Sequence, residues 1–160
     1  MKFISSFLIL FIAIANLAVA SSLEGRVTVI DGDTLEMHGK RIRLHGIDAP
    51  ESGQTCRSQS GKTYRCGQLA AKQMAKYTKR KTIRCNVRDT DRYGRLVAVC
   101  FADGQDINKR IVRDGFALAY RRFSRDYVAA ERNAKRDKVG MWQGAFIKPW
   151  DWRGGDRLSE

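Results

Sequence analysis

Short runs of β-branched and apolar residues mark the chain after residue 26, and turn-forming residues separate them. Such runs are typical of strands. Three of them follow closely in sequence: Val27–Ile30, Thr34–Met37 and Arg41–His45. They predict a three-stranded meander. In the third run, Ile42 and Leu44 alternate with basic residues, so we expect the apolar side chains to point inward and Arg43 to project outward from a rigid strand.

The spacing of apolar residues becomes helical further along the chain. It predicts helices in three segments: 68–79, 106–114 and 125–138. Asp106 and Ser124 are the predicted N-caps of the second and third helices. Tyr77 lies on the apolar face of the first helix, and we therefore expect it to pack in the core.

Two further strand-like runs, Thr82–Val87 and Leu96–Phe101, surround a polar turn and predict a hairpin. Five strands with helices between and after them indicate a small α+β protein. A five-stranded oligonucleotide-binding barrel with three helices fits this order. We find no internal repeat, so residues 21–160 are expected to form a single domain, with 143–160 as a Trp-rich C-terminal extension.

The first 20 residues have the features of a secretory signal peptide. Lys2 precedes an apolar run from Phe3 to Val19, and the small residues Ala18 and Ala20 mark a cleavage site after Ala20. The alternative is a retained anchor, but the run is at the lower limit of membrane-spanning length. We expect a secreted or periplasmic protein without stable membrane association.

Charge narrows the class of partner. The chain has 30 Lys and Arg against 17 Asp and Glu, a net charge of +13. Such an excess favours a polyanion: nucleic acid, an anionic membrane surface or an acidic polysaccharide. Charge alone does not choose among them.

The four cysteines allow three disulfide connectivities, and export makes disulfides the expected state. Zinc is the competing interpretation, but the chain lacks CxxC and paired-histidine spacing. We predict Cys56–Cys66, which would close a polar loop, and Cys85–Cys100, which would join the two strands of the hairpin.

Three clusters carry candidate chemistry: Ile30-Asp31-Gly32-Asp33-Thr34, Arg43 followed by Ile47-Asp48-Ala49-Pro50-Glu51, and Asp91-Arg92-Tyr93-Gly94-Arg95. Two carboxylates can hold a hard cation, a third can activate water, and two guanidiniums can clamp a phosphate. Each residue also has a structural alternative, as a turn residue, an ion-pair partner or a solvated charge. His38 and His45 are too isolated for a histidine-based site.

These motifs, in this order, resemble the thermonuclease or staphylococcal nuclease-like family, from about Val27 to Trp142. The resemblance implies an oligonucleotide-binding barrel and a Ca²⁺-dependent phosphodiesterase that cuts DNA and RNA to leave 3′-phosphate ends. It implies Asp33 and Asp48 as carboxylate ligands of Ca²⁺. The backbone carbonyl of Ala49 is the implied third ligand, at a position where the family has threonine.

The implied catalytic residues are Glu51 as general base and Arg43 and Arg95 as phosphate clamps. The candidate substrate-binding residues are Arg92, Tyr93 and Tyr120, through phosphate contacts and base stacking. Core or rim packing is the alternative for both tyrosines. The family's second tyrosine, two residues after the position of Tyr120, is Arg122 here.

The sequence thus predicts an exported, monomeric, Ca²⁺-dependent endonuclease that acts on DNA and RNA, favouring single or denatured strands, with little sequence preference. One alternative is a non-catalytic nucleic-acid-binding protein of the cell envelope with the same barrel. Another is a cationic envelope protein that binds acidic glycans or lipid head groups. The presence of Arg43, Glu51 and Arg95 argues against the first, since a protein that only binds nucleic acid has no need of an acid at position 51. The second predicts binding that is insensitive to calcium and to competing oligonucleotide.

Overall fold

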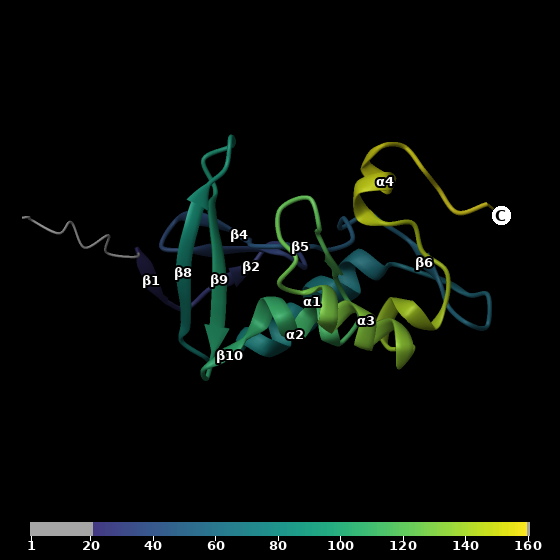
Figure 1. Ribbon diagram of the computed structural model, residues 1–160, viewed down its shortest axis with the longest axis horizontal. Helices are drawn as coiled ribbons and strands as arrows, with labels where there is room; N and C mark the ends of the chain where they lie inside the picture. The colour runs from purple at the N-terminus through teal and green to yellow at the C-terminus, as the bar shows by residue number, and fades with distance from the viewer. Residues whose placement is uncertain (1–20, 160) are drawn as a thin grey trace, which may run out of the picture.

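The computed structural model describes residues 21–159. A curled mixed β-sheet lies toward one end of its long axis, and the helices lie beside the sheet and toward the other end (Figure 1). In this part of the chain the sheet has seven strands: β1 (Ser22–Gly25), β2 (Thr28–Val29), β3 (Thr34–Met37), β4 (Lys40–Leu44), β8 (Ile83–Thr90), β9 (Leu96–Ala102) and β10 (Gln105–Asp106). They follow the order β1-β8-β9-β4-β3-β2, and β10 pairs with β9. This half-barrel with its helices has the predicted α+β oligonucleotide-binding architecture. The predicted signal peptide, residues 1–20, lies outside the described residues.

The five predicted strands are all present; β3 has the predicted ends, and the ends of the other four are shifted. The run predicted at Val27–Ile30 shortens to β2, and the run predicted at Thr82–Val87 extends to Thr90 in β8. Strands β1 and β10 were not predicted. The β1 segment contains one large apolar residue, Leu23, and the strand forms by pairing with β8.

The strand register places the site. In the β3–β4 pair, Thr34 lies opposite Arg43, so Asp33 immediately before β3 comes beside Arg43. Strand β4 also pairs with β9 in parallel orientation, with Arg43 opposite Val97. Both edges of β4 are therefore hydrogen-bonded to neighbouring strands, which holds the backbone of Arg43 in place. Two short strand pairs lie outside this sheet: β5 (Ile47–Asp48) with β11 (Leu118–Ala119), and β6 (Cys56–Arg57) with β7 (Thr63–Tyr64).

The described helices are α1 (Cys66–Thr78), α2 (Ile107–Arg113), α3 (Val128–Arg136), the 3₁₀ helix η1 (Gly140–Gln143) and α4 (Pro149–Arg153). Asp106 caps α2 as predicted, since its side chain accepts the Lys109 N–H at 2.8 Å. The prediction for the third helix was wrong at its start. It begins at Val128, and Ser124 instead accepts the Asp126 N–H in a local turn.

One apolar core joins the curled sheet to α1, α2 and α3. Its fully buried side chains include Leu35 and Ile42 from the sheet, Met74 from α1 and Ile111 from α2. Tyr77 is buried in this core, as predicted.

The four cysteines form two disulfides, Cys56–Cys66 and Cys85–Cys100, which are the pairs that the sequence predicts. Cys85 and Cys100 are register partners across β8 and β9, with Cα atoms 4.0 Å apart. The Cys56–Cys66 bond ties the β6–β7 loop to the start of α1.

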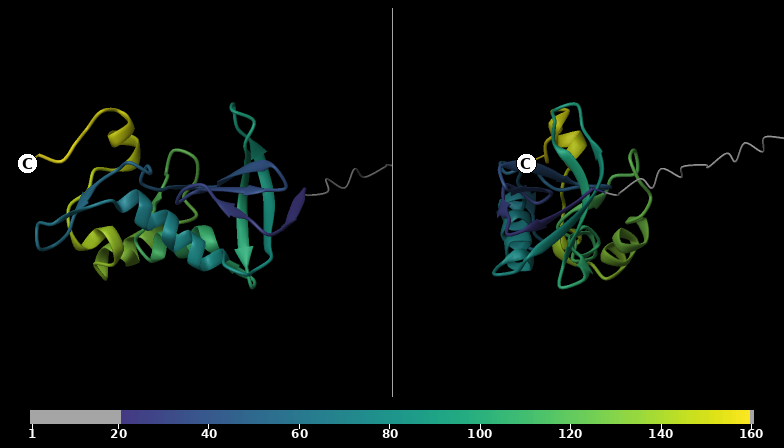
Figure 2. Two further views of the ribbon diagram at one scale, coloured as in Figure 1. Left: turned by 180° about the vertical axis from the view of Figure 1, so that it is seen from behind. Right: turned by 90° about the vertical axis from the view of Figure 1, so that its left-hand side faces the viewer.

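Helix α4 and strand β1 lie toward opposite ends of the long axis of the molecule (Figures 1 and 2). Among residues 21–159, no helix has the length and apolar content needed to cross a membrane.

Candidate active site

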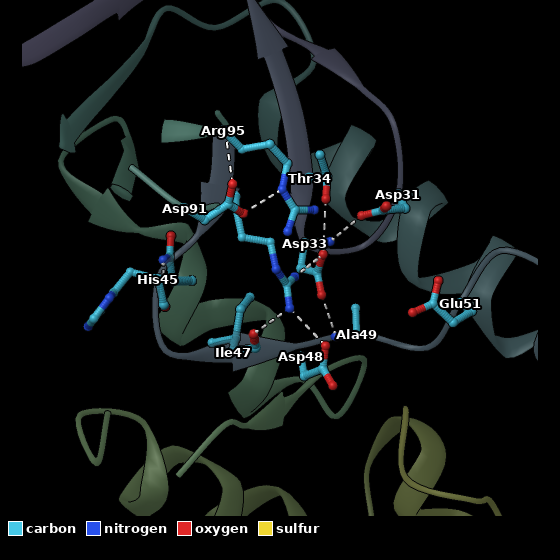
Figure 3. A network of polar contacts seen from close by, with 12 residues as sticks. Asp31, Asp33, Thr34, His45, Ile47, Asp48, Ala49, Glu51, Asp91 and Arg95 are labelled. Carbon is cyan, nitrogen blue, oxygen red and sulfur yellow. Dashed lines mark hydrogen bonds and ion pairs between the residues drawn. The ribbon is translucent and has the colours of Figure 1, made fainter. Parts of the chain in front are cut away.

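The Arg43 guanidinium, at the end of β4, joins two carboxylates that come from separate segments (Figure 3). It forms ion pairs with Asp33 and with Asp48 Oδ1, the latter at 2.8 Å. The Arg43 side chain is 16% exposed, and that of Asp48 is fully buried. A planar guanidinium can donate to both carboxylates at once. It therefore sets the distance between them and also compensates their negative charge.

Asp33 is held from several sides. Its Oδ2 accepts the Ala49 N–H at 2.7 Å and its Oδ1 accepts the Thr34 hydroxyl at 3.1 Å. Its own N–H donates to Asp31 Oδ1 at 2.9 Å. The glycine between the two acids is required, because a Cβ at Gly32 would lie 2.6 Å from the Ala49 Cβ. The Asp31-Gly32-Asp33 turn can therefore approach the Asp48-Ala49 segment closely enough to bond with it.

Asp48 lies on β5 and is oriented by the pairing of that strand with β11. Besides Arg43, it contacts Arg153 of α4: Nη1 donates to Oδ1 at 3.2 Å and Nη2 to Oδ2 at 2.7 Å. Burial raises the pKa of Asp48, and the Arg153 hydrogen bonds and the two guanidinium charges act against that rise.

Glu51 follows Pro50 in the loop before β6, and its side chain is partly exposed. Figure 3 shows Glu51 beside the Arg43 cluster without direct contact to it. Arg153 bridges the two, because its Nη1 also donates to Glu51 Oε1 at 2.6 Å. The backbone here is close to α1, since a Cβ at Gly67 would overlap the Glu51 carbonyl oxygen at 1.7 Å.

Arg95 lies at the turn between β8 and β9, and its ionic partner within the described residues is Asp91 of the same turn, at 2.7 Å from Nε to Oδ2. Burial alone would raise the pKa of Asp91, but hydrogen bonds from Arg95 and from the Tyr93 N–H lower it below its ordinary value. Figure 3 shows the Arg95 side chain directed toward the Asp33 end of the cluster. The structure thus brings Arg95 near the site but pairs it locally.

The two candidate stacking tyrosines differ in accessibility. Tyr93 is 68% exposed, and the guanidinium carbons of Arg92 and Arg95 lie 4.8 and 5.6 Å from its ring centre. Tyr120 is partly buried, and the indole of Trp150 stacks on it at 5.3 Å with the planes 7° apart.

Sequence reasoning missed Arg153. The sequence predicted residues 143–160 only as a Trp-rich C-terminal extension. In the structure Trp150 of this extension, and Trp142 just before it, pack on a small buried cluster. The acidic contact partners of Arg153 lie about 100 residues earlier, in the loop that follows β5 and in β5 itself. Neither motif nor spacing in the sequence could have signalled this contact.

The donors available for a metal are two carboxylates, from Asp33 and Asp48, and the Ala49 carbonyl. Within residues 21–159, no three His, Cys, Asp or Glu side chains cluster as a metal site by themselves. Burial, and then the charge of Asp33, raise the pKa of Asp31 to about 6. The Arg153 guanidinium on Asp48 is a second cation beside Arg43. All-oxygen donors in such surroundings fit a hard divalent cation that completes its coordination with water and substrate.

A family model described as staphylococcal nuclease homologue matches residues 41–144. The chain is 37% identical over 127 residues to the succinoglycan biosynthesis protein ExoI of Rhizobium meliloti, which covers 78% of this chain and 66%, just under two thirds, of that protein. It is 32% identical over 145 residues to the micrococcal nuclease of Shigella flexneri, covering 79% of this chain and 78% of the relative. An uncharacterized endonuclease of Haemophilus influenzae is 30% identical over 164 residues, with 98% and 86% covered. The chain belongs to the staphylococcal nuclease homologue family.

Proposed function

We propose that this protein is a Ca²⁺-dependent endonuclease that hydrolyses phosphodiester bonds of DNA and RNA with little sequence preference and leaves 3′-phosphate ends. One observation carries the proposal. The Arg43 guanidinium and the Asp33 and Asp48 carboxylates, drawn from three segments, share one ion-pair network, and Glu51 is linked to it through Arg153. Membership of the nuclease family and the names of two relatives support it.

Asp33 and Asp48, with the Ala49 carbonyl, would hold the calcium ion. When bound, Ca²⁺ supplies positive charge that binds a phosphate oxygen and polarises phosphorus toward attack. The Ala49 N–H bond to Asp33 Oδ2 keeps that carboxylate in a single orientation. Replacement of the family's threonine by Ala49 removes a hydroxyl but keeps the carbonyl.

Glu51 is the general base in this proposal. It is partly exposed, so water reaches it, and its position next to Pro50 restricts the backbone. Its carboxylate accepts the proton of a water molecule that attacks phosphorus, while Arg43 stabilises the charge that grows on the phosphoryl oxygens. The bond from phosphorus to the 5′-oxygen breaks, and this oxygen takes a proton from solvent and leaves as a 5′-hydroxyl, so the phosphate stays on the 3′ end. Arg95 adds a second guanidinium once it leaves Asp91.

The β8–β9 turn would supply the contacts to parts of the substrate other than the reacting phosphate. The exposed Tyr93 ring can stack on a base, and Arg92 beside it can contact a phosphate. Stacking on an accessible ring requires an unpaired base, which favours single or denatured strands. The two disulfides fit an oxidising compartment, in keeping with the predicted export.

A cleavage assay on denatured DNA and on RNA, run with calcium and with a chelator, tests the proposal. We expect Glu51→Gln to lower turnover by about 10²- to 10⁴-fold with little change in substrate affinity. The matched control is Glu24→Gln, which removes an exposed acid on β1. Equal cleavage with and without calcium would contradict the calcium role.

The main alternative is a binding protein that shares the barrel and lacks catalysis. It predicts that the wild type binds oligonucleotide without cutting it and that Glu51→Gln binds equally well or more tightly. A competition assay distinguishes the nuclease and the nucleic-acid-binding protein from a glycan-binding protein. Only the glycan-binding protein would bind an added acidic polysaccharide in preference to the oligonucleotide.

A further inference from the structure

The C-terminal strap, residues 148–153, lies over the candidate active site. Its last residue, Arg153, donates to both oxygens of Asp48 and to one oxygen of Glu51. The strap therefore contacts one proposed metal ligand and the proposed general base with a single side chain.

Arg153 uses the same oxygens that a metal ion would use. Asp48 Oδ2 accepts from Arg153 alone among the described residues, at 2.7 Å, and Oδ1 is shared with Arg43. The Asp48 side chain is fully buried, so water does not compensate its charge, and a cation in this position is strongly favoured. Guanidinium and metal cannot both occupy the Oδ2 side of this carboxylate.

The second contact of the strap is independent of the first. Trp150 stacks on Tyr120 with near-parallel planes, 7° apart, and with ring centres separated by 5.3 Å. This is the geometry in which a nucleic-acid base stacks on an aromatic side chain. The Trp150 indole thus covers Tyr120, the candidate base-stacking ring. The same short helix, α4, also places the Arg153 guanidinium against Asp48 and Glu51.

The chain is fixed to the body of the protein just before the strap, so the strap can move while Ile147 stays in place. Gln54, fully buried, donates from Nε2 to the Ile147 carbonyl at 2.7 Å, just before the strap begins. Helix α4 has only five residues, too few to be stable without its contacts. Arg153 itself remains 38% exposed, which leaves it able to exchange its carboxylate partners for water.

We propose that the C-terminal strap is an autoinhibitory, intramolecular ligand: Arg153 competes with a divalent cation for Asp48 and Glu51, and Trp150 competes with a substrate base for Tyr120. The closed strap is the resting state, and binding of cation and nucleic acid together displaces it. The inference rests on the proposed function for the identity of both ligands, but the competition for Asp48 can be measured without catalysis.

The decisive experiment is calcium titration of the full chain by calorimetry, with no nucleic acid present. We expect Arg153→Gln, which removes the charge, to bind calcium about 5- to 150-fold more tightly than the wild type, the usual range for coupling between two sites. The control is Arg132→Gln, which removes the charge of an exposed arginine on α3, outside the strap. Its calcium affinity should equal that of the wild type.

A second variant tests the strap through its other contact. Trp150→Ala leaves Arg153 in place but removes the stack, so we expect a smaller gain in calcium affinity and a lower KM for oligonucleotide. Amide hydrogen exchange of residues 150–153 should become faster in the wild type when calcium is added. Thermal unfolding of each variant confirms that it is folded.

The outcomes separate this inference from the proposed function. Tighter calcium binding by Arg153→Gln in a protein that never cleaves nucleic acid would support the strap and overturn the nuclease. Unchanged calcium affinity combined with reduced turnover would make Arg153 a substrate contact and overturn the strap. Absence of calcium binding in every variant would overturn the competition as well.

Discussion

The two arginines proposed to clamp the phosphate are held in opposite ways. Arg43 lies at the end of a central strand, is 16% exposed, and pairs with two carboxylates from separate segments. Arg95 lies on an exposed turn, is 29% exposed, and pairs with Asp91 four residues earlier. The first guanidinium is positioned by the whole barrel, and the second by its own turn.

This difference separates what is preorganised from what must move. The position of Arg43 is already fixed by strand register and by two ion pairs within the proposed site. Arg95 must exchange Asp91 for the substrate. The two residues should therefore contribute similarly to turnover and differently to folding.

Arg43→Ala should have the largest effect. Loss of Arg43 leaves the buried Asp33 carboxylate without its cationic partner and leaves Asp48 with Arg153 alone. We expect this to cost about 3 to 5 kcal/mol of unfolding free energy, and turnover should fall by about 10²- to 10³-fold. Urea unfolding and single-turnover cleavage measure the two effects. A variant as stable as the wild type would show that the ion pairs do not hold this end of the barrel.

Arg95→Ala should separate activity from stability. We expect a similar loss of turnover, about 10²- to 10³-fold, but less than about 1 kcal/mol of unfolding free energy, because its ion pair is local and partly solvated. The same two assays apply. Full activity in this variant would remove Arg95 from the site and leave Arg43 as the sole clamp.

Removal of the Cys85–Cys100 disulfide tests whether the two regions are independent. The double variant Cys85→Ala/Cys100→Ala opens a loop of sequence separation 15, worth about 3 kcal/mol. Amide hydrogen exchange should increase in β8 and β9, whose connecting turn carries Arg95. The increase should be smaller around Asp33 and Asp48. Uniform loosening of both regions would show that the hairpin and the Arg43 cluster unfold together.

Asp91→Asn should have the smallest effect, and a defined pH dependence. The pKa of Asp91 is lowered in the folded protein, so its stabilisation is present above the unfolded pKa of about 3.9 and is lost as the pH falls through the folded value. Wild type and variant should differ by less than about 1 kcal/mol at pH 6 and converge as the pH falls through the lowered pKa of Asp91. Thermal unfolding across this range measures the difference, and a gap that widens toward low pH would contradict the assignment.

Local patterns predicted the elements that depend on local spacing. Alternation identified β3 and β4, helical periodicity identified α1 and α2, and hairpin reasoning paired Cys85 with Cys100. The start of α3 was misplaced because Ser124 satisfies a nearby turn instead of the helix, a competing bond that sequence does not distinguish from a cap.

The site was predictable only in part. Asp33, Arg43 and Asp48 lie in short motifs and come together in the fold. The Arg153 contact with Asp48 spans 105 residues and depends on a five-residue helix, which is too short to leave a periodic signal. Covering of Tyr120 by Trp150 is likewise a product of tertiary packing.

The proposed reaction requires Glu51 and its neighbours to act on one phosphodiester linkage. Product-end analysis of a short, end-labelled single strand, cut by wild type and by Glu51→Gln in calcium, tests this directly. We predict 3′-phosphate ends from the wild type and a loss of about 10²- to 10⁴-fold in their rate of formation in the variant. Equal rates from both proteins, or intact strands with the wild type, would contradict it.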